Sequence, residues 1–318
     1  MAMNRIRFLY GMSLPEFLRG FGTEAACAQA VMAARWPNGF ECPKCGEEAH
    51  CVISSVDFRP LFQCNECHRQ TSVTAGTLSA GTKLPLTTWF LAIYLISQAK
   101  TGLSALALKR QLGVSYPTAW LIHHKLMQAM AHREERYVLC GRVQIDDAYL
   151  GGERSGGKVG RGSENKIPFV AAVSLNDDGH PLRIKLTPVA GFTLKAIEQW
   201  AHAHLAKATT VLSDGLACFG AVTAAGCTHQ PTVVAGRKPK ELPEFKWINT
   251  MLGNLKTSLT GSYHSFAFGK YAARYLSAFS YRFNRRFDLS TLHERLLVAA
   301  VHCSPAARRL IRAADVHC

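Results

Sequence analysis

The sequence predicts a mixed α/β domain that follows two smaller N-terminal units. Three observations support this prediction. Two C-x-x-C motifs stand near the N-terminus, two helical segments joined by a glycine turn follow them, and strand patterns alternate with helical ones beyond residue 140. Strands and helices mixed in this order are typical of a layered α/β domain.

These changes in pattern divide the chain, whose 318 residues suffice for about two domains, into five segments. We expect an N-terminal helical segment at 1–39, a metal-binding ribbon at 40–78, a helix–turn–helix unit at 84–135, the α/β domain at 140–290 and a C-terminal helical segment at 291–318. The N-terminal segment begins with a partial capping box, in which Ser13 caps a helix and Glu16 reaches back.

The composition points to a reduced compartment and to a polyanionic partner. A formal charge of +15 and a pI near 9.5 favour a nucleic acid as the partner, although a merely basic soluble protein has the same composition. The longest apolar runs are too short to span a bilayer and the N-terminus lacks the pattern of a signal peptide, so we expect a cytoplasmic protein without membrane contact. The odd number of 11 cysteines indicates reduced thiols, some of them bound to a metal.

The two C-x-x-C motifs predict a structural zinc site. Cys42 and Cys45 form the first pair, and Cys64 and Cys67 form the second. Each pair offers two thiolates on a tight turn, and four thiolates make the tetrahedral shell that Zn²⁺ prefers, with no position left open for catalysis. The residues between the pairs, from His50 to Phe62, suit the hairpin of a zinc ribbon.

Residues 104–130 have the pattern of a helix–turn–helix. Ser104 and Ser115 are suited to cap the two helices, and Gly113 lies in the turn. The second helix enters the major groove in DNA-binding versions of this motif, whereas an ordinary helical hairpin is the alternative. The side chains expected to face DNA, with the histidines exposed or turned to phosphates, are Tyr116, Thr118, His123, His124 and Lys125.

Carboxylates at two strands predict a metal site in the α/β domain. Asp146 interrupts the apolar strand Arg142–Leu150, and Asp214 stands at the carboxyl end of a later strand, where α/β sheets place their sites. Side-chain alternation is expected to turn Asp147 to the opposite face of its strand. Oxygen ligands of this kind suit Mg²⁺ or Mn²⁺, although a structural salt bridge also explains buried aspartates.

A helix expected at 244–259 completes this candidate site. Asn249 fits the position of a third metal ligand, and Lys256 lies on the same helical face, suited to a phosphate. The alternatives are an amide on the helix surface and a solvated charge. A glycine-rich loop at 151–166 carries four cations and either closes on phosphates or serves as a solvated linker. Near the end of a long helix, Arg282, Arg285 and Arg286 form a basic cluster expected to bind DNA phosphates.

The segments IDDAYLGG, SDG, WINTMLGNLK, GSYH and YRFNRRF together resemble the zinc-ribbon group of bacterial insertion-sequence transposases. The resemblance extends from the ribbon to the C-terminal region, with the motifs in the family's order. It implies an RNase H-like catalytic domain with a DDE-type acidic triad. By this resemblance Asp146 and Asp214 match the first two acidic positions, Asn249 stands at the third, where many members have Glu and a subgroup has Asn, and Lys256 matches the family's following lysine.

The resemblance implies a DNA transposase whose partner is double-stranded DNA, both the element ends and the target. Such an enzyme binds the terminal inverted repeats of its element and catalyses metal-dependent strand cleavage and strand transfer. Because an element has two ends, a homo-oligomer on the DNA is expected. Two other classes remain open at this point. One is a catalytically inactive or repurposed sequence-specific DNA-binding protein, and the other is a non-specific nuclease of the same fold.

Overall fold

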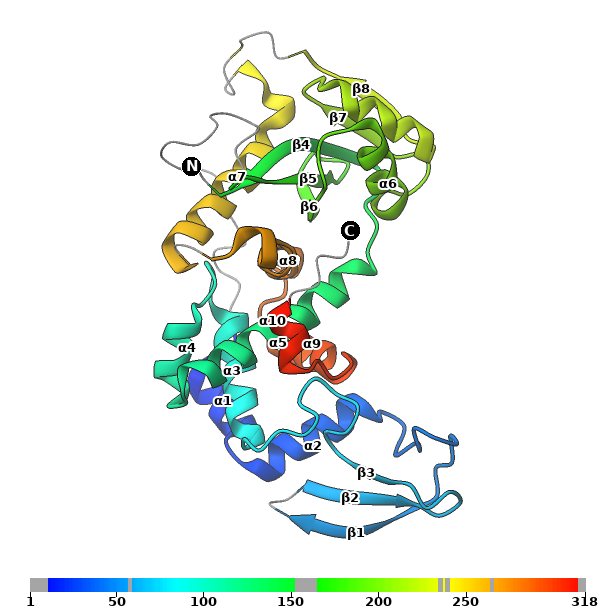
Figure 1. Ribbon diagram of the computed structural model, residues 1–318, viewed down its shortest axis with the longest axis vertical. Coiled ribbons are helices and arrows are strands. Elements are labelled where there is room, and N and C mark those ends of the chain that lie inside the picture. The colour runs from blue at the N-terminus through cyan, green and yellow to red at the C-terminus, as the bar shows by residue number, and fades with distance from the viewer. Residues whose placement is uncertain are drawn as a thin grey trace. The chain divides into compact units, whose positions relative to one another are not determined.

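The computed structural model describes residues 11–56, 59–151, 165–233, 237, 241–263 and 266–313 (Figure 1). The chain divides into two compact units, one made of Met1–His132 and Arg285–Arg312 and the other of Arg133–Asn284 and Ala313–Cys318. The finer division into five segments remains a proposal. None of the helices in the described part of the chain combines the length and the apolar character needed to cross a membrane.

The first unit combines a small antiparallel sheet with helices. Its sheet has the order β1-β2-β3, and the expected hairpin is the β1–β2 pair, in which His50 lies opposite Cys64. The elements are α1 (Leu14–Phe21), α2 (Glu24–Arg35), β1 (His50–Val56), β2 (Arg59–Cys64), β3 (Gln70–Ser72), α3 (Leu86–Gln98), α4 (Ala105–Leu112), α5 (Tyr116–Glu135), α9 (Leu292–Val301) and α10 (Arg308–Ala313); α5 and α10 end in the second unit.

Local sequence signals set the ends of these helices. Ser13 and Glu16 form the expected capping box at the start of α1. The helical segment predicted there is two helices, because the chain breaks at Gly22 and Thr23 caps α2. Ser104 caps α4 as predicted, and Gly113 ends that helix with a φ of +65°, a left-handed conformation that glycine adopts without strain.

The second unit is built on a five-stranded mixed sheet. Its order is β6-β5-β4-β7-β8, with β4, β5 and β6 antiparallel and β4, β7 and β8 parallel. This is the RNase H-like sheet expected from the sequence. The elements are β4 (Arg142–Leu150), β5 (Ile167–Leu175), β6 (Pro181–Pro188), α6 (Leu194–His204), β7 (Thr210–Ser213), the 3₁₀ helix η3 (Ala217–Ala225), β8 (Thr228–Pro231), the 3₁₀ helix η5 (Pro243–Phe245), α7 (Lys246–Ser258), the π-helical turn η6 (Leu259–Tyr263) and α8 (Phe268–Asn284).

Each face of this sheet packs against its own set of helices (Figure 1). Val143 and Ile145 of β4 lie in the core that includes residues of α6 and η3, whereas Ala148 and Leu150 belong to the core with α7 and α8. Alternate residues of β4 therefore face opposite cores, as side-chain alternation requires. The strand ends at Gly151, where φ is +91° and an added Cβ would lie 2.1 Å from the carbonyl oxygen of Asn165, so only glycine fits.

Candidate active site and metal centre

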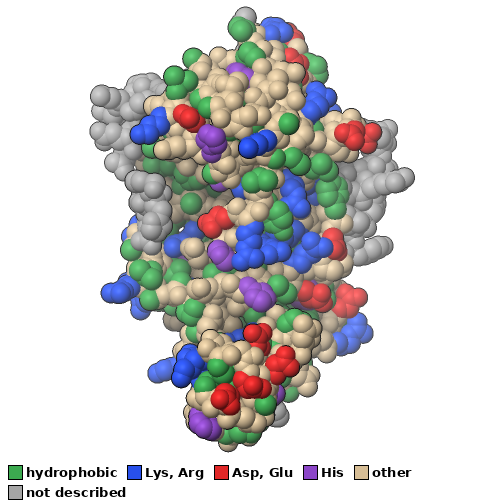
Figure 2. All heavy atoms as spheres, turned by 90° about the vertical axis from the view of Figure 1, so that its right-hand side faces the viewer, with side chains coloured by type: hydrophobic (Ala, Val, Ile, Leu, Met, Phe, Trp, Pro, Cys, Tyr) green, Lys and Arg blue, Asp and Glu red, His purple; other side chains and the backbone are tan. Residues whose placement is uncertain are grey.

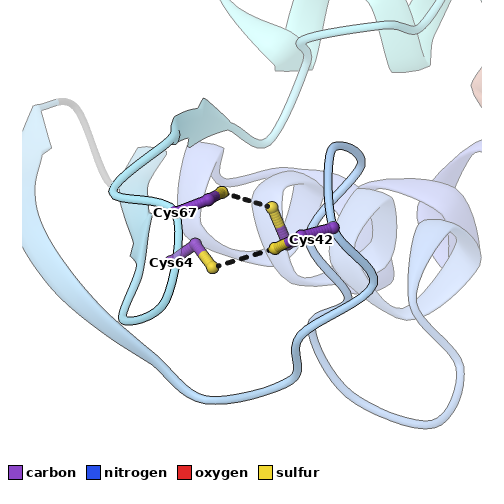
Figure 3. Close-up of side chains that lie close together, drawn as sticks. Cys42, Cys64 and Cys67 are labelled. Atoms are coloured by element: carbon purple, nitrogen blue, oxygen red, sulfur yellow. Dashed lines mark hydrogen bonds between the residues drawn. The ribbon is translucent and has the colours of Figure 1, made fainter.

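The four predicted zinc ligands come together in the first unit (Figure 3). The Sγ atoms of Cys42 and Cys67 are 3.5 Å apart, as are those of Cys45 and Cys64, and all four sulfurs lie within 4.8 Å of one another. Four thiolates about 2.3 Å from one Zn²⁺ have their sulfurs separated by about 3.8 Å, so this donor set fits a tetrahedral zinc ion closely.

The two cysteine turns have equivalent backbone geometry. In the first, the amide of Gly46 donates to the carbonyl of Cys42, and in the second the amide of His68 donates to that of Cys64. Gly46 and His68 each follow the second cysteine of their pair and both have a positive φ. Burial alone would raise the pKa of the Cys42 thiol, but hydrogen bonds from the backbone of Lys44 and Cys45 and from the thiols of Cys67 and Cys45 lower this pKa to about 6. Although a backbone hydrogen bond from Glu47 lowers the pKa of Cys45, hydrogen bonds among the cluster's thiols and burial raise it to about 12, so the thiolate is favoured at Cys42. A lowered pKa favours the thiolate that binds zinc.

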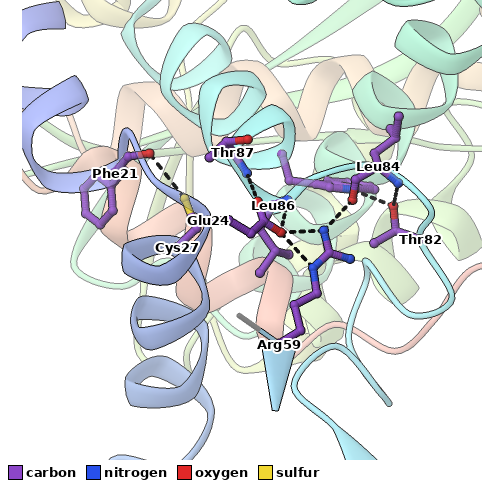
Figure 4. Close-up of polar contacts among 9 residues, drawn as sticks. Phe21, Glu24, Cys27, Arg59, Thr82, Leu84, Leu86 and Thr87 are labelled. Atoms are coloured by element: carbon purple, nitrogen blue, oxygen red, sulfur yellow. Dashed lines mark hydrogen bonds and ion pairs between the residues drawn. The ribbon is translucent and has the colours of Figure 1, made fainter. Parts of the chain in front are cut away.

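Glu24 connects the ribbon to the helices of the same unit (Figure 4). Its Oε1 accepts hydrogen bonds from Arg59 Nε at 2.7 Å and from the backbone amide of Leu86 at 2.8 Å, and its Oε2 accepts from the amide of Thr87 at 3.2 Å. The two amides begin α3, which has no cap from its own N-cap residue, Pro85. One carboxylate thus pairs with strand β2 and caps helix α3.

The acidic residues of the second unit form a cluster of three carboxylates. Oxygens of Asp146, Asp147 and Asp214 lie within 4.8 Å of one another, and all three side chains are partly exposed. Asp146 and Asp214 are brought together by the parallel pairing of β4 with β7. Gln144 lies beside Leu212, and the same register extended by two residues sets Asp146 beside Asp214.

The membership of Asp147 corrects the expectation that its side chain faces away from the site. Asp147 does start from the opposite face of β4, but the pairing of β4 with β7 ends at Gln144 and Leu212, and β7 itself ends at Ser213, so no paired strand separates the two faces beside Asp147. A carboxylate on either face can therefore reach around the edge toward Asp214. Alternation along one strand could not have indicated this, because it depends on where the neighbouring strand stops.

The turn that carries Asp214 is held by hydrogen bonds. Asp214 Oδ1 accepts from the amide of Leu216 at 3.1 Å, and the buried Ser213 Oγ accepts from the amide of Gly215 at 3.3 Å. Ser213 Oγ is also hydrogen-bonded to Nε2 of His229 on β8, at 2.8 Å. One Asp214 oxygen is therefore already used by the turn, and the orientation of the carboxylate is set before any ligand binds.

Asn249 and Lys256 both lie on the exposed side of α7. The buried stripe of this helix consists of Ile248, Met251, Leu255 and Ser258, and both predicted site residues lie outside it. The helix starts against β4, where the amide of Ile248 donates to Oε1 of Gln144 at 3.0 Å. Asn249 thus directly follows Ile248, which is hydrogen-bonded to the strand that carries Asp146. The role of Asn249 as a metal ligand remains a prediction.

The helix–turn–helix unit is formed, but part of its predicted DNA-facing set is buried. Tyr116 is 47% exposed, and Thr118 forms a hydrogen bond with Ser115 at 2.9 Å between side-chain oxygens. The expectation that the histidine pair is exposed is wrong, because His123 and His124 are each 1% exposed. The ring centroids of His124 and Trp120 are 4.0 Å apart. Lys125 Nζ donates to the carbonyl of Leu78 at 2.9 Å, and burial lowers its pKa.

The expected basic cluster at the end of α8 is also largely buried. Arg282 and Arg285 are 9% and 7% exposed, which contradicts a cluster that presents its guanidinium groups to solvent. Arg286 is half-buried, its guanidinium carbon lies 4.0 Å from the ring centroid of Phe287, and burial lowers its pKa to about 10. The sequence shows that three arginines lie close together, but it does not show which of their side chains are buried. Three of the four cations of the loop at 151–166, Arg154, Lys158 and Arg161, lie outside the described residues, and Lys166 is half-buried.

Comparison with known proteins gives two matches to protein families and one curated relative. Residues 138–284 match the ISXO2-like transposase domain, and residues 22–70 match the transposase zinc-ribbon domain. An uncharacterized protein in transposable element ISH50 of Halobacterium salinarum is 26% identical over 217 residues, which cover 64% of this chain and 71% of that protein.

The chain also matches a solved structure, that of a pre-cleavage Mos1 transpososome. The two are 12% identical, the match covers 68% of this chain and 79% of that chain, and the TM-score is 0.25. The two family matches coincide with the two sites described above. The ribbon match includes Cys42, Cys45, Cys64 and Cys67, and the transposase-domain match includes Asp146, Asp147, Asp214 and Asn249. The chain therefore belongs to the zinc-ribbon, DDE-type family of insertion-sequence transposases.

Proposed function

We propose that this transposase binds the ends of its element and catalyses metal-dependent strand cleavage followed by strand transfer. The observation that carries the proposal is the cluster of Asp146, Asp147 and Asp214 in a domain of the transposase family. Their oxygens lie within 4.8 Å of one another, and ligand oxygens on opposite sides of one Mg²⁺ are about 4.2 Å apart. Small side-chain adjustments therefore suffice to bind one divalent ion.

The side chains around the cluster have distinct parts in this proposal. Asp146, Asp147 and Asp214 hold the metal, Asn249 contributes a neutral amide oxygen, and Lys256 neutralises a phosphate of the DNA. Divalent metal held by these residues would supply activation of the attacking oxygen and stabilisation of the leaving oxygen of a phosphodiester. Water attacks phosphorus and the bond to the 3′ oxygen breaks, which frees a 3′-hydroxyl. That hydroxyl then attacks a phosphodiester of the target DNA.

The surface charges favour a DNA contact at the helix–turn–helix unit over one at the ribbon. Figure 2 shows acidic side chains gathered on the ribbon, where Glu41, Glu48 and Glu66 are exposed. These carboxylates repel DNA phosphates, whereas Lys109 and Arg110 of the helix–turn–helix unit are exposed. We therefore assign the recognition of DNA bases to Tyr116 and Thr118. The contacts of this unit with DNA phosphates are assigned to Lys109 and Arg110.

A single experiment separates this proposal from the other classes. Purified protein is incubated with labelled element-end DNA and Mg²⁺ and scored for binding, nicking and joining, with end DNA of scrambled sequence as the control. Joining of the cleaved ends to target DNA is the expected result. Binding without cleavage would identify an inactive DNA-binding protein, and equal cutting of both DNAs without joining would identify a nuclease. Chemical crosslinking of the same complexes tests whether a homo-oligomer forms on the DNA.

A further inference from the structure

Helix α7, which carries Asn249 and Lys256, begins without a capping side chain of its own. Its N-cap residue is Phe245, which provides no side-chain hydrogen bond, and the short 3₁₀ helix η5 leads directly into it. The first backbone amides of a helix have no partner within the helix, and Ser, Thr, Asp or Asn at the N-cap commonly supplies one. The start of α7 therefore needs its partner from another element.

Gln144 of strand β4 supplies this partner. Its Oε1 accepts a hydrogen bond of 3.0 Å from the amide of Ile248, at the third position of α7, and its Nε2 donates to the carbonyl of Glu244 just before the helix. The Gln144 side chain is 2% exposed, so solvent does not compete for either bond. A side-chain amide suits this place because it combines a donor nitrogen with an acceptor oxygen, and both atoms are used.

The position of Gln144 on its strand connects this clamp to the carboxylate cluster. Gln144 and Asp146 are two residues apart on β4 and share the face whose later members, Ala148 and Leu150, pack in the core with α7. The clamp fixes the first turn of α7 along its axis and in rotation. Asn249 directly follows Ile248, so its position relative to Asp146 depends on this pair of hydrogen bonds.

We propose that Gln144 is a positioning residue of the active site, which sets the register between α7 and β4 and thereby places Asn249 for metal binding. This inference rests on the proposed function of Asn249, and it adds a residue that neither contacts the metal nor binds DNA. Without the amide, a buried backbone N–H and a buried C=O lose their partners, and the helix start is free to shift.

The test uses full-length Gln144→Met, which keeps the approximate length of the side chain and removes both polar atoms. The matched control is Asn284→Leu. Asn284 makes the same kind of bridge in the same unit, because its Oδ1 accepts from the amide of Ile184 at 2.8 Å and its Nδ2 donates to the carbonyl of Ile184 at 3.0 Å, besides a hydrogen bond to Glu134. Amide hydrogen exchange is measured in α7, together with end binding and cleavage across a Mg²⁺ titration.

We expect Gln144→Met to speed amide exchange of Ile248 by about tenfold or more, because its acceptor is lost. End binding should stay at the parental level, cleavage should fall by about tenfold and half-saturation should move to higher Mg²⁺. In the Asn249→Ala background the same change should lower cleavage by less than about twofold, because both substitutions act through one interaction. Asn284→Leu should leave exchange at Ile248 and the Mg²⁺ midpoint unchanged.

Unchanged exchange at Ile248 in Gln144→Met would overturn the inference, whatever the activity. An equal loss of cleavage in the parental and Asn249→Ala backgrounds would also overturn it, because Gln144 would then act by another route. Parental protein that binds the ends but never cleaves them would refute the proposed function instead. In that case the exchange measurement still decides whether Gln144 fixes the start of α7.

Discussion

Asp146 and Asp147 leave strand β4 on opposite faces, yet oxygens of both lie within 4.8 Å of an oxygen of Asp214. The carboxylate cluster therefore carries three formal negative charges. The family resemblance implies two carboxylates, Asp146 and Asp214, because Asn249 stands at the third acidic position. A third carboxylate at Asp147 supplies charge that the amide of Asn249 lacks.

The carboxylate cluster leads to the first prediction. We expect Asp146→Ala and Asp214→Ala each to abolish strand cleavage and to leave end binding intact, because hard oxygen ligands are lost without change to the DNA-binding unit. Asp147→Asn keeps the shape but removes one charge, so cleavage should need about tenfold more Mg²⁺. The measurement is cleavage of labelled ends over a metal titration. If Asp147→Asn matched the parental titration curve, Asp147 would be no ligand.

Asn249 gives the second prediction. Asn249→Ala should lower cleavage strongly, whereas Asn249→Asp should retain activity and reach its optimum at lower Mg²⁺, because a carboxylate adds charge to the site. The same end-cleavage assay over a metal titration measures both variants. Thr250→Ala, at the neighbouring exposed position of α7, serves as the control. Parental cleavage by Asn249→Ala at every metal concentration would remove Asn249 from the site.

The third prediction concerns the ribbon. Each chain should bind one Zn²⁺, and Cys64→Ser should lose it and unfold residues 40–70 locally, because thiolate–zinc bonds supply the folding free energy of so small a unit. Metal analysis and hydrogen exchange measure the two effects. Cys51→Ser is the control, because Cys51 is exposed and outside the cluster. Stoichiometric zinc in Cys64→Ser would contradict the assignment.

His204 at the end of α6 gives a prediction about pH. Burial, aided by the nearby charge of Lys185, lowers the pKa of His204 from 6.5 to about 4. Between these values the unfolded chain binds a proton that the folded chain does not, so stability falls as the pH drops from about 6.5 toward 4 and is regained as it rises. The contribution is at most about 3 kcal/mol. Between pH 7 and pH 5 the melting temperature should fall less in His204→Gln than in the parental protein. If the melting temperatures of both proteins fell equally with pH, His204 would not be the cause of the acid destabilisation.

The parts of the site that follow from local pattern could be predicted from the sequence. The ribbon cysteines depend on spacing within two short turns, and Asp146 and Asp214 were identified from their places on predicted strands. The alternation of strand and helix patterns and the family motifs together predict the mixed α/β fold. Each of these features depends on residues close together in the sequence, so residue spacing and hydrophobic periodicity can predict it.

The features that the sequence did not reveal depend on distant parts of the chain. The place of Asp147 in the cluster follows from the early end of β7, and the role of Gln144 follows from contact with a helix about 100 residues later. The burial of His124 was missed because α5 has buried residues on several sides, so it lacks the single apolar stripe that separates inside from outside.

The short length of β7 also determines what size of molecule can approach the cluster. β4 continues past the last residue of β7, so the sheet has a step at which the three carboxylates are partly exposed. A longer β7 would cover that step with backbone. An open ledge does not enclose its ligand, and a polymer can cross it and continue on both sides of the reacting bond. Within the described residues, one short strand thus leaves the cluster open to a polymer of any length, and we expect selectivity to come from contacts elsewhere along that polymer.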